Sequence, residues 1–372
     1  MSKVVIAPDS FKGSATSIEV AAAIAKGWQS VRPSDELIQI PFADGGEGTL
    51  LALEKAQPSA HRIYCPDISP DAYWLLLDDA TAVVELAQVS GITHLAKLNP
   101  MGAHTFVFGQ LLADAAKHPG VRRIFAALGG SASTDAGVGA LMALGFEFLD
   151  SDGSAVGLGG AEISRIATII SAKAIAPPKG GVIVLVDVQS PLLGTNGTAT
   201  VFAPQKGATP AQVLELDKAL AHFIGISGHA DSAGSGAAGG TAFGLCALWG
   251  ATIRSGAETI AELSGLNSAI IGADLIITGE GRLDNQSFGG KVVGHISALA
   301  HISGIPIAYC VGSIEEDFPS SSRGGVSLSQ LAGSAEQAMR NTEKFLIEAG
   351  EQLTHFISDF QLKLRRRRES FK

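Results

Sequence analysis

The sequence has few charged residues, few aromatic residues and little cysteine. Of its 372 residues, 17% are charged and 6% are aromatic, whereas 46% are hydrophobic. A chain of this composition can bury a large core, which argues against intrinsic disorder. Because its length exceeds that of most single domains, we expect two α/β domains.

Basic charge is also scarce. The net charge of −9 provides no global field that would recruit nucleic acid. In the one basic run, residues 363–372, the single aromatic residue is Phe371 near its end, and none lies between the arginines. We interpret it as a solvated helix end rather than a tail that binds nucleic acid or membrane. The expected partners are therefore small molecules, and a homodimer is an assembly that the sequence allows.

Features of secreted and membrane proteins are lacking as well. The three cysteines, Cys65, Cys246 and Cys310, lie far apart and form no CxxC pair, which is typical of reduced thiols in a cytoplasmic protein. Asp9 and Lys12 interrupt the apolar start, so we expect no signal peptide. The uncharged stretch 232–253 is dominated by Gly, Ala and Ser, which favours a buried glycine-rich helix over a membrane span.

Several catalytic motifs are missing from the sequence. No GxxxxGK[ST] occurs, which excludes a P-loop, and no GxGxxG opens the first strand–helix unit, which argues against a nicotinamide dinucleotide site. The nine histidines show no HExxH or other ligand spacing, so zinc is not expected. No GxSxG elbow supports a serine hydrolase.

What the sequence does contain is a series of short apolar strands that each end in a polar turn. The turns are "PDSFKGS" with Asp9, Ser10 and Lys12; "ADGGEG" with Asp44 and Glu47; "GGSASTD" with Ser131, Ser133, Thr134 and Asp135; "DVQSPLLGTNG" with Asp187; and "TGEGRLDNQ" with Thr278, Glu280, Arg282, Asp284 and Gln286. Turn and cap hydrogen bonds are sufficient to explain any one of them. Five such turns predict a shared site for Mg²⁺ and phosphate, since loops after parallel strands lie on the ligand-binding edge of a sheet.

The turn "GGSASTD" is the strongest candidate for binding phosphate. Gly129 and Gly130 let the backbone approach a ligand, Ser131 and Ser133 supply donors, and a helix is predicted to begin within the segment. The amides and dipole of a helix N-terminus favour an anion. An ordinary capped helix with packing glycines explains the same residues equally well.

The predicted topology is discontinuous. Residues 1–70 and 286–372 are expected to form a Rossmann-like α/β domain, and residues 71–285 a second α/β domain inserted into it. "YWLLLDDATAVVELA" indicates a hairpin. The stretch 335–360 predicts a long amphipathic closing helix.

Taken in order, the motifs resemble those of the glycerate kinase family, which includes the bacterial glycerate 2-kinase type of glyoxylate and glucarate/galactarate catabolism. The resemblance covers nearly the whole chain and includes "QKGA" and "GSGAAGG" in addition to the five turns. The sequence departs from the family pattern at Ser190 and Thr134, where Asn is usual, and "SAGSGAAGG" lacks a usual Pro.

The resemblance implies ATP-dependent phosphorylation of D-glycerate with Mg²⁺, the substrate lying in a cleft between two α/β domains. The related bacterial enzymes indicate the 2-hydroxyl as acceptor. Phosphorylation of the 3-hydroxyl is the alternative, and a non-catalytic sensor of hydroxy acids is a second alternative.

On this basis we assign a hypothetical role to each polar turn residue. Lys12, Asp187, Glu280 and Arg282 are the catalytic candidates, with Asp187 and Glu280 also the candidate metal ligands. The nucleotide is assigned to Gly129, Gly130, Ser131, Ser133, Asp135 and Gly281. Glycerate is assigned to Ser10, Asp44, Glu47, Asp284 and Gln286. Charge neutralisation by a Lys or Arg and proton removal by a carboxylate are what transfer of phosphate to a hydroxyl requires.

Overall fold

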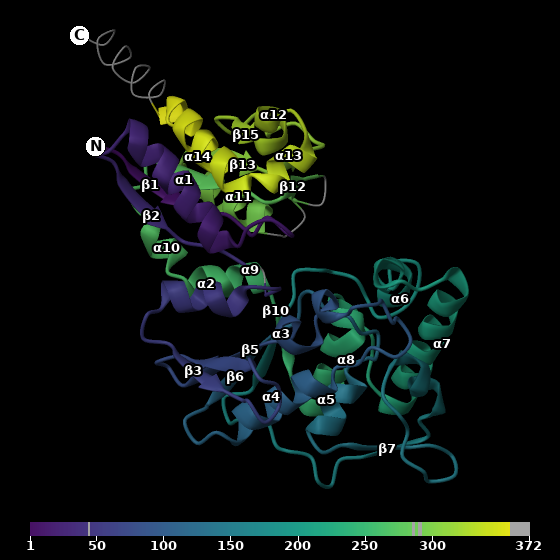
Figure 1. Cartoon of the computed structure of the whole chain (residues 1–372). Helices are drawn as coiled ribbons and strands as arrows, with labels where there is room; N and C mark the ends of the chain where they lie inside the picture. The colour runs from purple at the N-terminus through teal and green to yellow at the C-terminus, as the bar shows by residue number, and fades with distance from the viewer. Residues whose placement is uncertain (44, 285–286, 289–291, 358–372) are drawn as a thin grey trace, which may run out of the picture. The chain divides into compact units, whose positions relative to one another are not determined.

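The computed structural model describes residues 1–43, 45–284, 287–288 and 292–357 (Figure 1). The chain forms two compact units, which are treated separately below. Unit 1 contains Met1–Ala43, Leu51–Gln57 and Ile260–Lys372, and unit 2 contains Asp44–Leu50 and Pro58–Thr259. Unit 1 is thus built from both ends of the chain.

Unit 1 contains a parallel five-stranded sheet. In spatial order its strands are β15 (Gly325–Ser327), β13 (Ile307–Val311), β11 (Leu275–Thr278), β1 (Lys3–Ile6) and β2 (Glu36–Gln39). All four pairings are parallel. β11 and β13 are buried along their whole length, as expected for strands covered on both faces. A short parallel pair, β12 (Arg282–Leu283) and β14 (Ser313–Ile314), lies beyond the ends of β11 and β13.

The helices of unit 1 are α1 (Ser17–Val31), α10 (Leu266–Ala269), α11 (Val292–Ile302), α12 (Leu328–Ala332), α13 (Ala335–Arg340) and α14 (Thr342–Leu353). α1 begins with a capping box between Thr16 and Glu19. α1 and α14 pack side by side (Figure 1), and a Cβ atom at Gly27 would lie 1.9 Å from the carbonyl oxygen of Ile347. The small residue therefore permits the close approach of the two helices.

Two predicted elements of unit 1, the first strand and the closing helix, can be compared with the structure. The strand predicted from "KVVIA" is confirmed as β1. The single closing helix predicted over 335–360 is wrong within the described residues, because Asn341 adopts φ −130° and ψ 40° and separates α13 from α14. The basic run 363–372 lies outside the described residues.

Unit 2 contains a mixed six-stranded sheet. In spatial order its strands are β10 (Thr252–Arg254), β9 (Val182–Leu185), β6 (Arg123–Ala127), β5 (Thr81–Glu85), β4 (Tyr73–Leu76) and β3 (His61–Tyr64). β5, β6, β9 and β10 run parallel, whereas β4 pairs antiparallel with both β3 and β5. The predicted hairpin is thus confirmed as β4 and β5. A separate antiparallel pair is formed by β7 (Glu147–Leu149) and β8 (Thr168–Ile170).

The helices of unit 2 are α3 (Ala87–Ser90), α4 (Phe106–Lys117), α5 (Val138–Ala143), α6 (Thr198–Phe202), α7 (Pro210–Ser227) and α8 (Ala237–Trp249), with 3₁₀ turns η1 (Ile92–His94), η2 (Gly160–Arg165) and η3 (Pro204–Lys206). Part of the glycine-rich stretch forms α8, in which Ala238, Gly239 and Gly240 have positive φ and regular helix follows them. Much of α8 is buried in the core of unit 2. Within the described residues, no helix is both long enough and apolar enough to cross a bilayer.

The α/β class is confirmed by these sheets and helices. The chain passes between the units within α2 (Thr49–Ala56) and α9 (Gly256–Leu263) as well as at the loops beside them. These positions differ from the expected boundaries near residues 70 and 286. β3 pairs with β4, which places it in the sheet of unit 2, and β11 pairs with β1, which places it in the sheet of unit 1.

Candidate functional site

In unit 1, two of the polar turns meet at the carboxyl ends of neighbouring strands. The amide of Asp9, after β1, donates to the carbonyl of Gly279, after β11, over 2.8 Å. The hydroxyl of Thr278 donates to the carbonyl of Ala7 over 2.8 Å. The first and last of the five polar turns therefore lie together, although the sequence separates them by most of the chain.

Glycines allow these backbones to touch. A Cβ atom at Gly281 would lie 3.3 Å from the Cα of Phe11, and one at Gly279 would lie 1.5 Å from the carbonyl oxygen of Cys310. The turn after β13 joins the same group, since the amide of Gly312 donates to the carbonyl of Glu280 over 3.0 Å. The turns after β1, β11 and β13 thus form one continuous surface of backbone at the ligand-binding edge of the sheet.

The predicted side chains of unit 1 differ in exposure. Lys12 is exposed, and Ser10, Glu280 and Asp284 are half-buried. Arg282 is exposed and forms an ion pair with Glu315, with 2.6 Å between Nη2 and Oε1. This hydrogen bond raises the pKa of Arg282, so the guanidinium stays charged. An anionic ligand at Arg282 would share it with Glu315 or displace Glu315.

In unit 2, the other three polar turns also meet. The amide of Gly129, after β6, donates to the carbonyl of Gly45 over 2.9 Å. A Cβ atom at Gly45, where φ is +89°, would lie 3.2 Å from the Cβ of Leu185, the last residue of β9. The turns at 45–50 and 129–135 and the end of β9 therefore lie together. Asp44 and Gln286 lie outside the described residues, and Glu47 is exposed.

A buried carboxylate anchors the turn at 45–50. Glu85 ends β5 and is almost fully buried, and its two oxygens accept from the amides of Gly48 and Leu50, each over 3.0 Å. Burial raises the pKa of Glu85 to about 7, against the opposing effect of these amides, and the Glu47 carboxylate raises it further. Glu85 thus holds the turn in place and titrates near neutrality.

Asp135 organises the start of α5 and is fully buried. One of its oxygens accepts from both the amide and the hydroxyl of Thr105, each over 2.8 Å, and from the amide of Gly139 over 3.2 Å. Its other oxygen accepts from the amide of Gly137 over 3.2 Å. These bonds give Asp135 a structural function, and its assignment to the nucleotide stays a prediction.

Lys206 lies beneath the loop Gly129–Ser133 and is only 3% exposed. Its ammonium donates to the Ser131 hydroxyl over 3.0 Å and, at shorter range, to the carbonyl of Ser133. Burial lowers the pKa of Lys206 to about 8, although the Asp135 carboxylate acts in the opposite direction. A cation held this way next to a glycine-rich loop raises the positive potential at that loop.

The same loop continues into strained backbone. Ala136 has φ +51° and Ala238, at the start of α8, has φ +54°. The two segments are joined by a hydrogen bond from the amide of Ala136 to the carbonyl of Gly239 over 3.0 Å. Non-glycine residues in this conformation cost free energy and concentrate at ligand sites.

Asp187 follows β9 and is half-buried. It accepts from the Ser255 hydroxyl over 2.9 Å and from the Ala257 amide over 3.0 and 3.2 Å. Asp187 therefore stabilises the first turn of α9 through its carboxylate.

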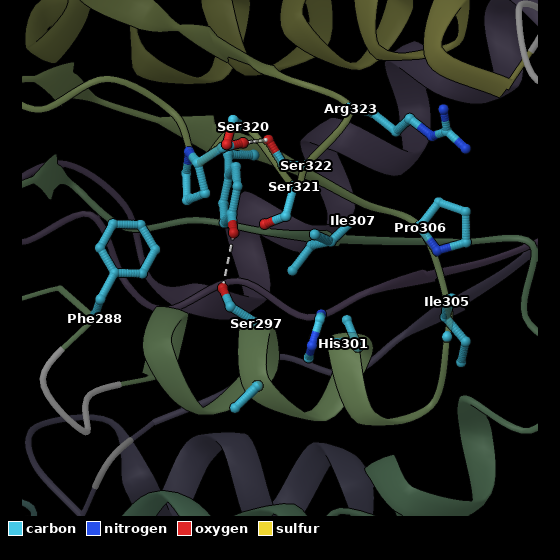
Figure 2. A pocket seen from close by; sticks show the side chains of 15 residues that line it. Phe288, Ser297, His301, Ile305, Pro306, Ile307, Ser320, Ser321, Ser322 and Arg323 are labelled. Carbon is cyan, nitrogen blue, oxygen red and sulfur yellow. Dashed lines mark hydrogen bonds between the residues drawn. The ribbon is translucent and has the colours of Figure 1, made fainter.

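A cavity of about 650 Å³ lies in unit 1 beside α11 and β13 (Figure 2). Its lining contains none of the predicted site residues. Polar groups in the wall bond to one another, as when Ser297 and Tyr309 pair through their hydroxyls over 2.8 Å and Ser322 donates to Pro319. Arg323 points away from the other lining side chains (Figure 2). The polar turns, and not this cavity, therefore carry the candidate site of unit 1.

Comparison with known proteins shows the family of the chain. The model of the glycerate kinase family matches residues 4–358. The chain belongs to the glycerate kinase family. A glycerate kinase of Halalkalibacterium halodurans is 36% identical over 95% of this chain and 97% of its own length. Glycerate 2-kinase of Escherichia coli K12 is 36% identical over 85% of this chain and 86% of its own length.

A solved structure assigned to a glycerate kinase has the same fold as this chain. A crystal structure assigned to glycerate kinase 2 of Salmonella typhimurium LT2 superposes with a TM-score of 0.73 at 31% identity. It covers 95% of this chain and 98% of that chain. The resemblance inferred from the ordered motifs is therefore confirmed at the level of the family.

The described residues contain no group of three or more His, Cys, Asp and Glu side chains that could hold a metal ion. Mg²⁺ at phosphate sites is usually held by one or two carboxylates together with phosphate oxygens and water. Asp187 and Glu280 are half-buried carboxylates that follow β9 and β11. Each is therefore a carboxylate of the kind that holds Mg²⁺ together with phosphate and water; Asp187 belongs to unit 2 and Glu280 to unit 1.

Sequence reasoning missed two functional candidates, Lys206 and Glu85. Lys206 stands in the family motif "QKGA", and Glu85 is the single charged residue that closes the apolar strand "TAVVE". An acid at the end of a buried strand is costly without donors, and this signal could have identified Glu85. No local signal marks Lys206 as buried, because its burial arises from contacts with residues distant in sequence.

Proposed function

We propose that the protein transfers the γ-phosphate of ATP to the 2-hydroxyl of D-glycerate, giving 2-phospho-D-glycerate and ADP. The family match over residues 4–358 carries the proposal. The name of the Escherichia coli relative, glycerate 2-kinase, supports the 2-hydroxyl as acceptor. The gathering of polar turns at strand ends within each unit supports a site for anionic ligands.

The reaction forms a bond between the substrate oxygen and the γ-phosphorus and breaks the bond from that phosphorus to the β–γ bridging oxygen. The hydroxyl proton passes to a carboxylate, for which Asp187 and Glu280 are the candidates. Lys12, exposed in the first turn, would neutralise charge on the transferring phosphate. Arg282, charged and exposed, would bind the glycerate carboxylate or a phosphate.

The remaining assignments follow the turns in which the residues lie. Gly130 and Gly281 would contact phosphate through their amides, and Ser131 and Ser133 through their hydroxyls. Gly129, whose amide donates to Gly45, would let the backbone of the loop approach the phosphate. Ser10, Glu47 and Asp284, together with Asp44 and Gln286 outside the described residues, would contact glycerate. Asp187 and Glu280 would hold Mg²⁺, which when bound neutralises the phosphate charges that develop during transfer.

The product of the reaction tests this proposal. We would incubate the protein with Mg²⁺-ATP and D-glycerate and identify the product by ³¹P and ¹³C NMR, with L-glycerate as the matched control substrate. 2-Phosphoglycerate and stoichiometric ADP are expected from D-glycerate. 3-Phosphoglycerate would favour the alternative acceptor, and binding of glycerate without ADP release would favour a hydroxy-acid sensor; either result would overturn the proposal.

A further inference from the structure

Lys206 is a buried cation, and no carboxylate of the described residues is in hydrogen-bond contact with it. Its ammonium is bonded to the Ser131 hydroxyl and the Ser133 carbonyl, while the nearby Asp135 carboxylate is occupied by Thr105 and by backbone amides. Burying a charge on neutral partners is costly, and an apolar side chain of similar length would fill this space without that cost. A need for positive charge or for a strong donor at this position explains why a lysine is found there.

The direction of the hydrogen bond to Ser131 follows from the chemistry of the two groups. An ammonium has three N–H donors and no lone pair, so Lys206 donates and the Ser131 oxygen accepts. The proton of Ser131 must then point away from Lys206. Ser133, buried in the same loop, has a hydroxyl with no hydrogen-bond partner among the described residues. The Ser131 hydroxyl thus keeps its own proton to donate, and the buried Ser133 hydroxyl is a second donor of the loop.

The loop that carries these hydroxyls is held rigidly. The carbonyl of Gly130, at φ +77°, accepts from the Ile92 amide over 2.9 Å, and the Ala132 amide donates to Ser90 over 3.0 Å. Backbone bonds thus fix both sides of Ser131, and Lys206 fixes its side chain. A preorganised donor loses less entropy when it binds a ligand than a freely rotating one.

We infer that Lys206 is a positioning residue that directs the Ser131 hydroxyl toward a phosphate group of the nucleotide bound at the loop Gly129–Ser133. This inference rests on the proposed function. A phosphate group fits the loop because it offers three acceptor oxygens and high negative charge to backbone amides, two hydroxyls and a nearby cation. The ammonium acts through Ser131 and contributes its charge without touching the ligand.

The inference is tested by a double-mutant cycle on nucleotide binding. The variants are Lys206→Met, Ser131→Ala and the double variant, with Lys218→Met on the exposed side of α7 as a matched control. We would measure the Kd of the Mg²⁺ complex of a non-hydrolysable ATP analogue by calorimetry, and the KM for D-glycerate. Each single change should raise the nucleotide Kd about 10-fold or more, as loss of a hydrogen bond to a charged group does.

Non-additivity is the decisive result. The double variant should bind the nucleotide about as weakly as Lys206→Met, because Ser131 is no longer directed once Lys206 is gone. The KM for glycerate and the behaviour of Lys218→Met should stay near wild type. Additive effects on Kd, or an unchanged Kd in Lys206→Met, would overturn the inference.

If Lys206→Met does not fold, the Kd of Ser131→Ala still tests the inference. Ser131→Ala removes one hydroxyl and can be interpreted alone: an unchanged Kd for the nucleotide analogue would overturn the inference. If the variants show the expected non-additive effects on the nucleotide Kd but the wild type forms no phosphoglycerate, only the proposed function is contradicted. If the wild type phosphorylates glycerate but Ser131→Ala leaves the nucleotide Kd unchanged, only the role of Lys206 is contradicted.

Discussion

The amide of Gly129 donates a hydrogen bond to the carbonyl of Gly45 over 2.9 Å and so joins two polar turns of unit 2 that are distant in sequence. A Cβ atom at Gly129 would lie 2.4 Å from the Cα of Gly46. Backbone rather than side chain occupies that space, and it cannot move aside as a flexible side chain could. The glycine is therefore required by the contact between the turns.

Replacing Gly129 with alanine is expected to separate these turns. Overpacking of this kind costs about 1–3 kcal/mol of stability, and displacement of the loop should lower kcat/KM as well. The matched control is Gly225→Ala in α7, where a Cβ atom would meet nothing within 4 Å. The control should be stabilised by about 0.5–1 kcal/mol through helix propensity. Urea unfolding and steady-state kinetics measure both effects, and equal stability of the two variants would contradict the expectation.

Asp187 can be separated from its capping function by a pair of variants. Ser255→Ala removes the hydroxyl that donates to Asp187 over 2.9 Å but keeps the carboxylate. It should lose about 1 kcal/mol of stability and retain its dependence on Mg²⁺. Asp187→Asn should lower kcat on the order of 10²-fold and raise the Mg²⁺ concentration needed for activity. If Asp187→Asn titrates with Mg²⁺ as the wild type does, Asp187 is no metal ligand.

Lys12 is the exposed cation of the first polar turn and is assigned to the transferring phosphate. Lys12→Met is expected to lower kcat/KM on the order of 10²-fold with little change in stability, because an exposed lysine contributes little to folding. Lys26→Met is the matched control, since Lys26 is also exposed and its ion pair with Glu343 lies on α1 and α14. Full activity of Lys12→Met in a coupled assay for ADP would remove Lys12 from the mechanism.

Glu85 should give the stability a measurable dependence on pH. Its pKa in the folded protein is about 7, against an ordinary value of 4.5. The folded state therefore binds more protons than the unfolded state between pH 4.5 and 7, and stability falls as the pH rises through this window. The loss should be on the order of 3 kcal/mol.

Glu85→Gln removes this titration, so its stability should vary less with pH over the same window. Urea unfolding of both proteins at pH 5, 6, 7 and 8 would show the difference, because all other titrating groups are shared. Parallel curves for the two proteins would show that Glu85 does not titrate near neutrality.

The polar turns were identifiable from sequence because each follows a short apolar strand, and both signals are local. The hairpin of β4 and β5 was predictable for the same reason. The boundaries of the units were not, because they depend on which strands pair: β3 extends the sheet of unit 2 and β11 extends that of unit 1. Asn341 similarly interrupts the closing helix although the apolar periodicity continues through it.

By itself, the sequence determined the α/β class, the family and the five turns from which the site must be built, since periodicity and ordered motifs are properties of neighbouring residues. Only the tertiary structure decided which turns touch within each unit, that Asp187 caps a helix, and that Lys206 and Glu85 are buried beneath the loops. Burial and long-range hydrogen bonds arise when distant segments pack together. Free energies of charged groups depend on that packing, so the acid that closes the strand at Glu85 could be noticed from sequence, but its donors and its pKa could not be predicted.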